Sequence, residues 1–347
     1  MKKQKFTQPL DIKNGKVEMV HGAGGKAMSQ LIDQLFVSKF DNDILTQQND
    51  QAFLTVPNNK IVMATDNHVI SPLFFPGGDI GALSIHGTVN DVVMSGAMPL
   101  YISCAFILEE GYPLAELDKI CQSMAKAAQQ ANVRIVTGDT KVVEKGHGDG
   151  VFINTTGIGV ITDGIERGAD KVNVGDKIIV SGTLGDHGVA IMSLRENLTF
   201  ETTIESDSQA LDDLVANMVS QVPEISCMRD PTRGGIAATM NEIAQQANVG
   251  IQLYEDDIPV KAQVKSACEF LGLDPLYVAN EGKLVAFCPA DKAVALLEIM
   301  QAHPQGQDAA IIGEVFEDSN NFVQLATSFG GMRMVDWING EQLPRIC

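Results

Sequence analysis

Short apolar segments alternate with longer helical segments along most of the chain, and this alternation limits the fold more than any other feature. Runs such as KIVMATD and LYISCAFIL are continuously apolar, which is typical of strands buried on both faces. The segment LAELDKICQSMAKAAQQA has apolar residues three and four positions apart, as in a helix packed on one side. Strands that alternate with helices in this way indicate a mixed α/β protein.

The chain of 347 residues is long enough for two domains, each with its own core. The polar, irregular stretch TDGIERGADKVN, residues 162–173, separates two such series of strands and helices. We therefore predict an N-terminal domain over residues 1–165, a C-terminal α/β domain over 170–333 and a short tail over 334–347. Within the first domain we also expect short strands at KVEMV and AFLTV, and Trp337 is predicted to anchor the root of the tail.

The strong negative charge excludes several classes of partner. The formal net charge is -19, whereas nucleic acids and anionic membranes are bound mainly through excess Lys and Arg. The basic start MKKQKFTQPL is not followed by the apolar core of a signal peptide, and no apolar run reaches the ~20 residues that span a bilayer. We expect a cytoplasmic protein that binds neither nucleic acids nor membranes, and that holds anions through backbone amides, local cations or a metal.

The six cysteines show neither a CxxC pair nor the spacing of a zinc finger. Four of them lie in apolar or helical segments, where a reduced thiol acts as a small hydrophobic group. Cys347 differs because it is the last residue, in the sequence PRIC, and it does not have the position required for prenylation.

Aspartates recur where apolar segments end in turns of small residues, and this pattern suggests a cation site. Carboxylates at strand ends suit Mg²⁺, which would bridge the phosphates of ATP. Lys141 and Arg233 are local cations able to reach phosphate oxygens, and TRGGIAATM would present backbone N–H groups at a helix start. A single Asp beside Gly is more commonly a turn former, so the pattern alone leaves metal binding open. The aspartates are Asp66, Asp91, Asp139 and Asp230, with Asp50 just before a predicted strand.

The loop HGAGGKA is not a P-loop, because Val20 replaces the required first glycine and Ala27 follows Lys26. It fits the loose dinucleotide pattern G-x-G-x-x-A, with Asp41 or Asp43 as the acidic residue further along. The segment FVSKFDND is a poor second strand for that pattern, so dinucleotide binding remains the weaker alternative.

Other polar residues allow two interpretations each. His68 and His86 lie in an apolar, glycine-rich region and are expected to be structural, while His187 is at a predicted helix start and would cap it. Glu281, in VANEGKLVA, is either an ordinary turn carboxylate or a buried base.

Six segments, in this order, resemble the HypE family of hydrogenase maturation factors: NDQA, TDNHVISPLFFPGGDIG, HGTVNDVVMSGAMPLYIS, RIVTGDTKVV, RDPTRGG and ANEGK. That family belongs to a group with aminoimidazole ribonucleotide synthetase and selenophosphate synthetase. The resemblance covers nearly the whole chain, and the terminal PRIC is its most specific element. Selenophosphate synthetases carry a reactive cysteine or selenocysteine in the N-terminal glycine loop, but HGAGGK has no thiol, which argues against that activity.

The resemblance implies a two-domain PurM-like architecture and a homodimer whose N-terminal domains form a β-barrel-like interface, with ATP and Mg²⁺ bound nearby. It implies that the carbamoyltransferase HypF loads a carbamoyl group onto Cys347, and that ATP drives its dehydration to a thiocyanate. The cyano group then passes to iron on a HypC–HypD scaffold. By the same resemblance, Asp50, Asp66, Asp91 and Asp230 are the metal and phosphate carboxylates, and Lys26, Arg233, Asp139 and Lys141 serve the nucleotide.

Dehydration needs a base that removes protons from nitrogen. Glu281 is the candidate, His86 is a weaker one, and Lys141 is the third catalytic candidate besides Cys347. We expect the tail to move, with Pro344 stiffening it and Arg345 either lowering the pKa of the thiol or guiding the tail into the site. Two alternatives remain: a related ATP-using synthetase or kinase that acts on a free small molecule, and a non-catalytic scaffold that presents the thiol to a partner.

Overall fold

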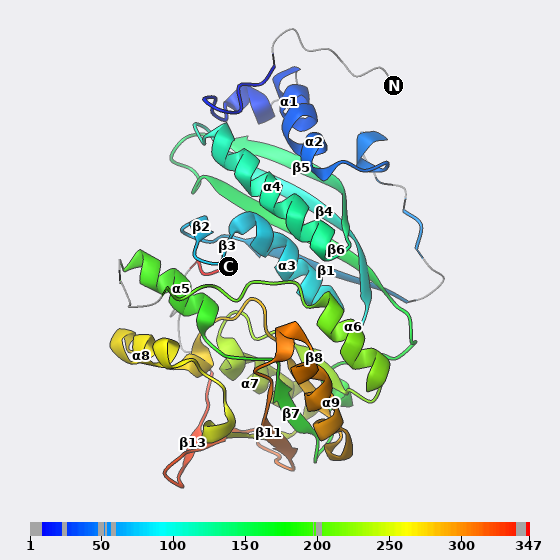
Figure 1. The fold of residues 1–347 in the computed structure, drawn as a ribbon, viewed down its shortest axis with the longest axis vertical. Coiled ribbons are helices and arrows are strands. Elements are labelled where there is room, and N and C mark those ends of the chain that lie inside the picture. The colour runs from blue at the N-terminus through cyan, green and yellow to red at the C-terminus, as the bar shows by residue number, and fades with distance from the viewer. Residues whose placement is uncertain are drawn as a thin grey trace.

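The computed structural model describes residues 9–22, 26–47, 52, 54–56, 60–196, 198, 203–337 and 345–347. Two sheets dominate this part of the chain, one above the other along the long axis of the molecule (Figure 1). The first sheet ends at Ile161, and the second begins at Lys177.

The first sheet has four strands, and helices cover only one of its faces (Figure 1). The pairs β1–β6 and β6–β4 are antiparallel, while β4 and β5 are parallel and are joined through a helix. That helix packs firmly because Leu117, Ile120 and Met124, three and four positions apart, are fully buried. The elements are β1 (Lys60–His68), β6 (Val151–Ile161), β4 (Met98–Glu109), β5 (Arg134–Val143), α3 (Ile80–Val93) and α4 (Leu114–Gln130).

Helix α3 lies unusually close to β6 because two glycines of that strand face it. A Cβ atom at Gly157 would lie 2.8 Å from Thr88 Cγ2 and 2.9 Å from Val92 Cγ2. At Gly159 the corresponding atom would lie 2.5 Å from Val92 Cγ1. The absence of side chains at these two positions therefore sets the distance between α3 and β6. Helix α3 carries Asp91, so this distance also positions Asp91.

The second sheet has seven strands in the order β13-β12-β9-β11-β7-β10-β8. Its neighbouring strands are antiparallel except for the parallel pair β12–β9. The strands are β7 (Lys177–Val180), β8 (Cys227–Arg229), β9 (Gly250–Tyr254), β10 (Val285–Cys288), β11 (Ala310–Phe316), β12 (Val323–Ala326) and β13 (Met332–Met334). The helices are α5 (Asp186–Arg195), α6 (Asp212–Gln221), α7 (Gly235–Ala247), α8 (Ala262–Leu271) and α9 (Ala290–Ala302).

Short elements connect these units. They are η1 (Met19–Gly22), α1 (Lys26–Leu31), η2 (Ile32–Val37), α2 (Ser38–Phe40), η3 (Leu45–Gln47), β2 (Phe74–Phe75), β3 (Gly78–Asp79), η4 (Ala169–Lys171), η5 (Glu255–Asp257), η6 (Pro275–Tyr277) and η7 (Pro304–Gly306). Among the described helices, none is both long and apolar enough to cross a bilayer.

One hydrophobic core joins the two halves. It contains Leu83 of α3, Met218 of α6, Leu296 of α9 and, from the last three residues, Ile346. Ile346 is only 4% exposed. The end of the chain is therefore packed inside the molecule, next to α3 and the β2–β3 hairpin (Figure 1).

Three sequence predictions need correction. KVEMV forms no strand in the described chain, since η1 occupies its end, and the described residues 52 and 54–56 of AFLTV are not in a strand. KIVMATD is a strand, but Ile61 and Met63 are 58% and 70% exposed because the outer face of the first sheet is uncovered. Trp337 is 38% exposed, and the root of the tail is held instead by buried Val335, whose carbonyl accepts a hydrogen bond from Asn241 Nδ2 at 2.9 Å.

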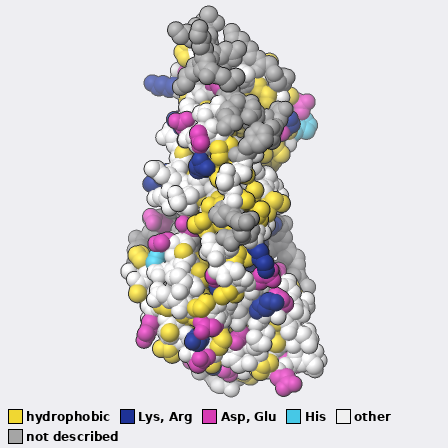
Figure 2. Space-filling model, turned by 90° about the vertical axis from the view of Figure 1, so that its right-hand side faces the viewer, with side chains coloured by type: hydrophobic (Ala, Val, Ile, Leu, Met, Phe, Trp, Pro, Cys, Tyr) yellow, Lys and Arg dark blue, Asp and Glu magenta, His cyan; other side chains and the backbone are white. Residues whose placement is uncertain are grey.

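All six cysteines are reduced, and the four predicted to be buried are buried. The first sheet is open in this chain, so it does not close into a barrel by itself. Hydrophobic side chains also gather at the surface across the middle of the side drawn in Figure 2.

The seating of α3 gives a stability prediction. Gly157→Val adds a β-branched side chain that suits a strand but collides with Thr88 and Val92, so we expect a loss of about 1–3 kcal/mol in the free energy of unfolding. Thr156→Val, one residue along on the open face, is the control and should change little. Denaturant titration of both variants measures this, and equal stabilities would contradict the tight contact.

Candidate active site

Three of the predicted aspartates gather between the two halves. Asp66 lies on β1, Asp91 on α3, and Asp230 directly follows β8. Burial, then the negative charges of Asp230 and Asp66, raise the pKa of Asp91 to about 8. Burial and the charge of Asp66 also contribute to raising the pKa of Asp230 to about 6. The three carboxyl groups therefore repel one another, and a cation between them would favour the ionised forms of Asp91 and Asp230.

The cluster is not a ready-made metal cage. Asp66, Asp91 and Asp139 lie inside a strand or helix, not in turns as the sequence pattern suggested; only Asp230 follows a strand directly. Within the described residues, no three His, Cys, Asp or Glu side chains are arranged to hold a metal. Mg²⁺ commonly needs only one or two carboxylates plus phosphate oxygens and water, so the cluster suits a nucleotide-bound Mg²⁺ better than a protein-only site.

Asn90 joins α3 to the loops around the cluster. Its Nδ2 donates to the carbonyls of Gln209 at 3.0 Å and Glu281 at 3.3 Å, and its Oδ1 accepts from Leu211 N at 2.8 Å. This side chain lies next to Asp91 in sequence. The hydrogen bonds of Asn90 therefore hold three segments together: the end of α3, the loop before α6 and the turn that contains Glu281.

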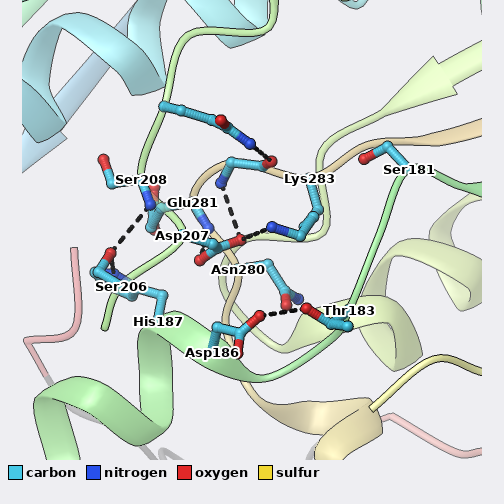
Figure 3. Close-up of polar contacts among 12 residues, drawn as sticks. Ser181, Thr183, Asp186, His187, Ser206, Asp207, Ser208, Asn280, Glu281 and Lys283 are labelled. Atoms are coloured by element: carbon cyan, nitrogen blue, oxygen red, sulfur yellow. Dashed lines mark hydrogen bonds and ion pairs between the residues drawn. The ribbon is translucent and has the colours of Figure 1, made fainter. Parts of the chain in front are cut away.

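Asp207 holds the same turn from the other side (Figure 3). Its carboxylate accepts from the N–H groups of Glu281 and Gly282, both at 3.2 Å, and pairs with Lys283 Nζ at 3.3 Å. Burial alone would raise the pKa of Asp207, but the charge of Lys283 and the backbone N–H of Glu281 lower it below its ordinary value. Asp207 is thus an ionised anchor for the turn.

Glu281 is the least compensated group in the site. It is 4% exposed, lies in the turn before β10, and its Oε1 has no hydrogen-bond partner within the described structure. Burial first, then the charges of Asp207 and Asp230, raise its pKa well above the ordinary value. A cation that balances the nearby charges would lower this pKa and favour the ionised carboxylate, which is the form that can accept a proton.

Cys347 is docked next to these carboxyl groups. Val69 N donates to Cys347 O at 2.9 Å, and Ser71 N donates to Arg345 O at 3.2 Å. Burial raises the pKa of the thiol, Glu281 raises it further, and Arg233 partly opposes both. The prediction that Arg345 lowers the pKa of the thiol is wrong: its guanidinium pairs instead with Asp149, at 2.7 Å.

Asp139 and Lys141 lie elsewhere. They are mostly exposed, 3.5 Å apart, on β5 at the edge opposite β1. Asp139 shares a register row with Asn154 and Asn67, which point to the open face, whereas Asp66 faces α3 and lies close to Gly87. Within one chain they are not brought together with the aspartate cluster.

The remaining predicted residues are spread around the site. His86 Nδ1 contacts Ser208 Oγ at 3.0 Å, and burial lowers the pKa of His86 to about 4, which makes it a weak base. His68 is buried, with Nε2 3.3 Å from Thr155 Oγ1 and 3.7 Å from Asp66 Oδ2, and its structural role stays a prediction. Lys26 begins α1, but its side chain lies outside the described structure, as does the whole of Asp50.

His187 is not the cap that the sequence suggested. The cap position of α5 is Gly185, while the ring of His187 contacts Ser206 Oγ and Ile346 O. Sequence analysis also missed Asp207. The run ESDSQA has no glycine or strand beside it, so no local signal marks it as part of the site.

Comparisons with known proteins match this architecture. Residues 48–161 match the family model of the N-terminal domain of AIR synthase related proteins, and residues 173–326 match that of the C-terminal domain. These two matches define the class to which the two-sheet fold belongs. The dinucleotide interpretation of HGAGGKA also fails structurally, because none of the described residues 9–22 forms the strand that should precede the loop.

More specific matches follow within that class. The carbamoyl dehydratase HypE of Azotobacter vinelandii is 63% identical over 338 residues, covering 97% of this chain and 99% of that protein. A crystal structure of HypE in complex with ATP has a TM-score of 0.92 at 46% identity, covering 95% of this chain and 99% of that chain. A HypE–HypF complex matches with a TM-score of 0.78 at 49% identity, covering 89% and 99%. This chain belongs to the carbamoyl dehydratase HypE family of hydrogenase maturation proteins.

The charge cluster gives a pH prediction for the metal-free protein. The pKa of Asp91 is raised in the folded state, so its protonated form favours folding at low pH and that contribution is lost as pH rises through about 8. Asp91→Asn removes the ionisation. At pH 8 it should raise the free energy of unfolding by on the order of 2 kcal/mol, since each pKa unit is worth about 1.4 kcal/mol and the neighbours share the shift.

At pH 4 the variant and the parent protein should have nearly equal stability. Asp308→Asn, at an exposed position, is the matched control and should follow the parent at both pH values. Denaturant titrations in the presence of a chelator measure the difference. A variant no more stable than the parent at pH 8 would refute the charge repulsion.

Proposed function

We propose that this protein is an ATP-dependent dehydratase that converts an S-carbamoyl group on its own Cys347 into a thiocyanate. One observation carries the proposal: the thiol is docked inside the molecule, and Glu281, buried and with one oxygen unpaired, is the charged group that affects it most. The names of the relatives and the ATP complex of a similar HypE support the same activity.

The chemistry needs two events at the carbamoyl group. The amide oxygen is a poor leaving group, and transfer of the γ-phosphoryl group of ATP to it makes it a good one. One N–H proton is lost as the O-phosphorylated imidate forms. Cleavage of the C–O bond then releases phosphate, and loss of the second N–H proton leaves S–C≡N and ADP. Glu281 is proposed to accept a proton from nitrogen, because its Oε1 is buried without a hydrogen-bond partner in the described structure and its charge acts on the Cys347 thiol.

Local cations and acidic groups would hold the nucleotide. Arg233 precedes the start of α7, where Gly234 and Gly235 both have positive φ and the helix presents backbone N–H groups. Asp66, Asp91 and Asp230 would hold Mg²⁺, which neutralises phosphate charge when it is bound. Lys26, in the glycine loop of the sequence, and Asp50 are proposed to complete the site.

In a homodimer, Asp139 and Lys141 would lie near the second subunit. The open face of the first sheet exposes Ile61, Met63 and Ile107, the last at 44%, and an exposed apolar sheet face of this kind suits a second copy of the chain. Lys141 lies on the same face and is paired with Ile107 on the next strand. We propose that Asp139 and Lys141 act at the nucleotide site of the partner subunit, because they cannot join Asp66 in their own.

The proposed partners follow from the tethered thiol. A HypF carbamoyltransferase would load Cys347, in line with the HypE–HypF complex of a relative, and a HypC–HypD scaffold would receive the cyano group on its iron. Both require the last three residues to leave the site seen here. The tail therefore needs a docked and an undocked position.

The role of Glu281 can be tested by Glu281→Gln, which keeps the shape of the side chain but cannot accept a proton. With HypF, carbamoyl phosphate and ATP present, intact mass should show carbamoylation of Cys347 but dehydration slowed roughly 100-fold or more. ATP binding should be retained. Glu298→Gln, on the exposed face of α9, is the matched control.

The same mass measurement separates the alternatives. Normal dehydration in Glu281→Gln would reject Glu281 as the base. Failure of the parent protein to gain any mass would favour an enzyme for a free small molecule, and carbamoylation without loss of water in the parent would favour a scaffold. Cys347→Ala should abolish the mass gain altogether.

The dimer proposal predicts the effect of a charge on the open sheet face. Met63→Glu would bury an unpaired carboxylate at the interface, so association should weaken roughly 30-fold or more, about 2 kcal/mol. Light scattering across a dilution series measures the change. Val294→Glu, at a 61% exposed position on α9, is the control, and dimers equally stable in both variants would place the interface elsewhere.

A further inference from the structure

We propose that His187 is a positioning residue that docks the end of the chain and thereby aims the Cys347 thiol at Glu281. Its Nε2 lies 2.7 Å from the carbonyl oxygen of Ile346, the residue next to the thiol-bearing one. His187 and Ile346 are both buried. This is a contact between a side chain of α5 and the backbone of the tail, 159 residues later in the chain.

The partners of the ring determine its tautomer. A carbonyl oxygen can only accept, so Nε2 must carry the proton and donate it to Ile346. Nδ1 is then an acceptor, and Ser206 Oγ, 2.8 Å away, donates to it. Burial lowers the pKa of His187, which keeps this neutral form at physiological pH. Every polar atom of the ring is therefore satisfied by the docked tail and by Ser206.

The ring is also held from behind. Ser206 Oγ accepts from Ser208 N at 3.1 Å, and Ser206 N donates to Pro76 O at 2.8 Å, so the serine is fixed on both sides. Phe75 packs edge-on against the imidazole, with ring centroids 5.6 Å apart. His187 and Ser206 lie together at the start of α5 (Figure 3). The donor that meets the tail is thus preorganised before the tail arrives.

The other side-chain contacts of the tail are less able to fix the thiol. Arg345 pairs with Asp149 through side chains that are 40% and 48% exposed, and Arg195 binds the carbonyl of Arg345 near the surface. Exposed ion pairs stabilise weakly. The bond from His187 is buried and lies one residue from the thiol, so its loss leaves the Ile346 carbonyl unpaired in the core, which favours the undocked tail.

The docking can be measured without ATP or a carbamoyl donor. Cys347 is half-buried, while the other five cysteines are buried, so one equivalent of N-ethylmaleimide reports on the undocked tail. His187→Leu removes the donor at similar size, and we expect alkylation of Cys347 to be about tenfold faster, as for the loss of one buried hydrogen bond. His187→Gln keeps an N–H donor at a similar reach and should restore most of the protection.

Two controls distinguish docking from unfolding. His303→Leu, at a histidine that pairs with Asp213 and not with the tail, should alkylate at the parent rate. If His187→Leu fails to fold, several thiols will react instead of one. The variant Ser206→Ala then replaces His187→Leu in the test. It removes the hydrogen bond to His187 Nδ1 and should raise the alkylation rate of Cys347 several-fold. Equal single-thiol rates in the parent, His187→Leu and Ser206→Ala would overturn the proposal, as would a His187→Gln variant as reactive as His187→Leu.

The effect of docking on dehydration rests on the proposed function, and a second measurement tests this effect. After HypF-dependent carbamoylation, single-turnover dehydration in His187→Leu should be about tenfold slower than in the parent, with ATP binding unchanged. Faster alkylation together with normal dehydration would overturn the positioning role. If the parent itself never dehydrates, the proposed function fails, while the alkylation rates still decide whether His187 docks the tail.

Discussion

Four neighbouring carboxyl groups that repel one another are the constraint on which this structure depends. Asp66, Asp91, Asp230 and Glu281 meet where the two halves of the molecule join, and burial together with their mutual repulsion raises the pKa values of the last three. On the proposed function, a bound cation would neutralise part of this charge, lower the energy of the folded protein and favour the ionised form of Glu281, which can act as a base. The same cation would let a strongly acidic protein hold an anionic nucleotide.

The tail carries the reacting group on Cys347 to these carboxyl groups, so the substrate is covalently tethered to the protein. Holding a reactant in place replaces a bimolecular encounter with an intramolecular one, and a large part of a barrier can be removed in this way. The benefit depends on geometry, and the chain supplies it through the buried contact of Ile346 with the core and through His187. An end that docks through a few hydrogen bonds can also leave, as loading and release of the cargo require.

The mixed α/β class, the family and the residues Asp66, Asp91, Asp230 and Glu281 were recognisable in the sequence, since local patterns and ordered motifs carry that information. The errors share a physical cause. Ile61 and Met63 looked buried because an apolar strand does not reveal whether a second layer covers it, and exposure there depends on another element or another chain. Arg345 was expected to lower the pKa of the thiol or to guide the tail, but its pairing with Asp149 depends on how the loop between β5 and β6 meets the tail.

By itself, the sequence determined the alternation of strands and helices, the acidic character and the motif order that identifies the family, because these depend on neighbours along the chain. Only the tertiary structure decided that Asp139 and Lys141 lie apart from the aspartate cluster, that Asp207 anchors the turn of Glu281, and that His187 meets Ile346. Those facts follow from the side of a sheet on which a residue falls and from contacts between residues that are 74 and 159 positions apart. Neither the pairing of strands nor the docking of a tail leaves a local signal.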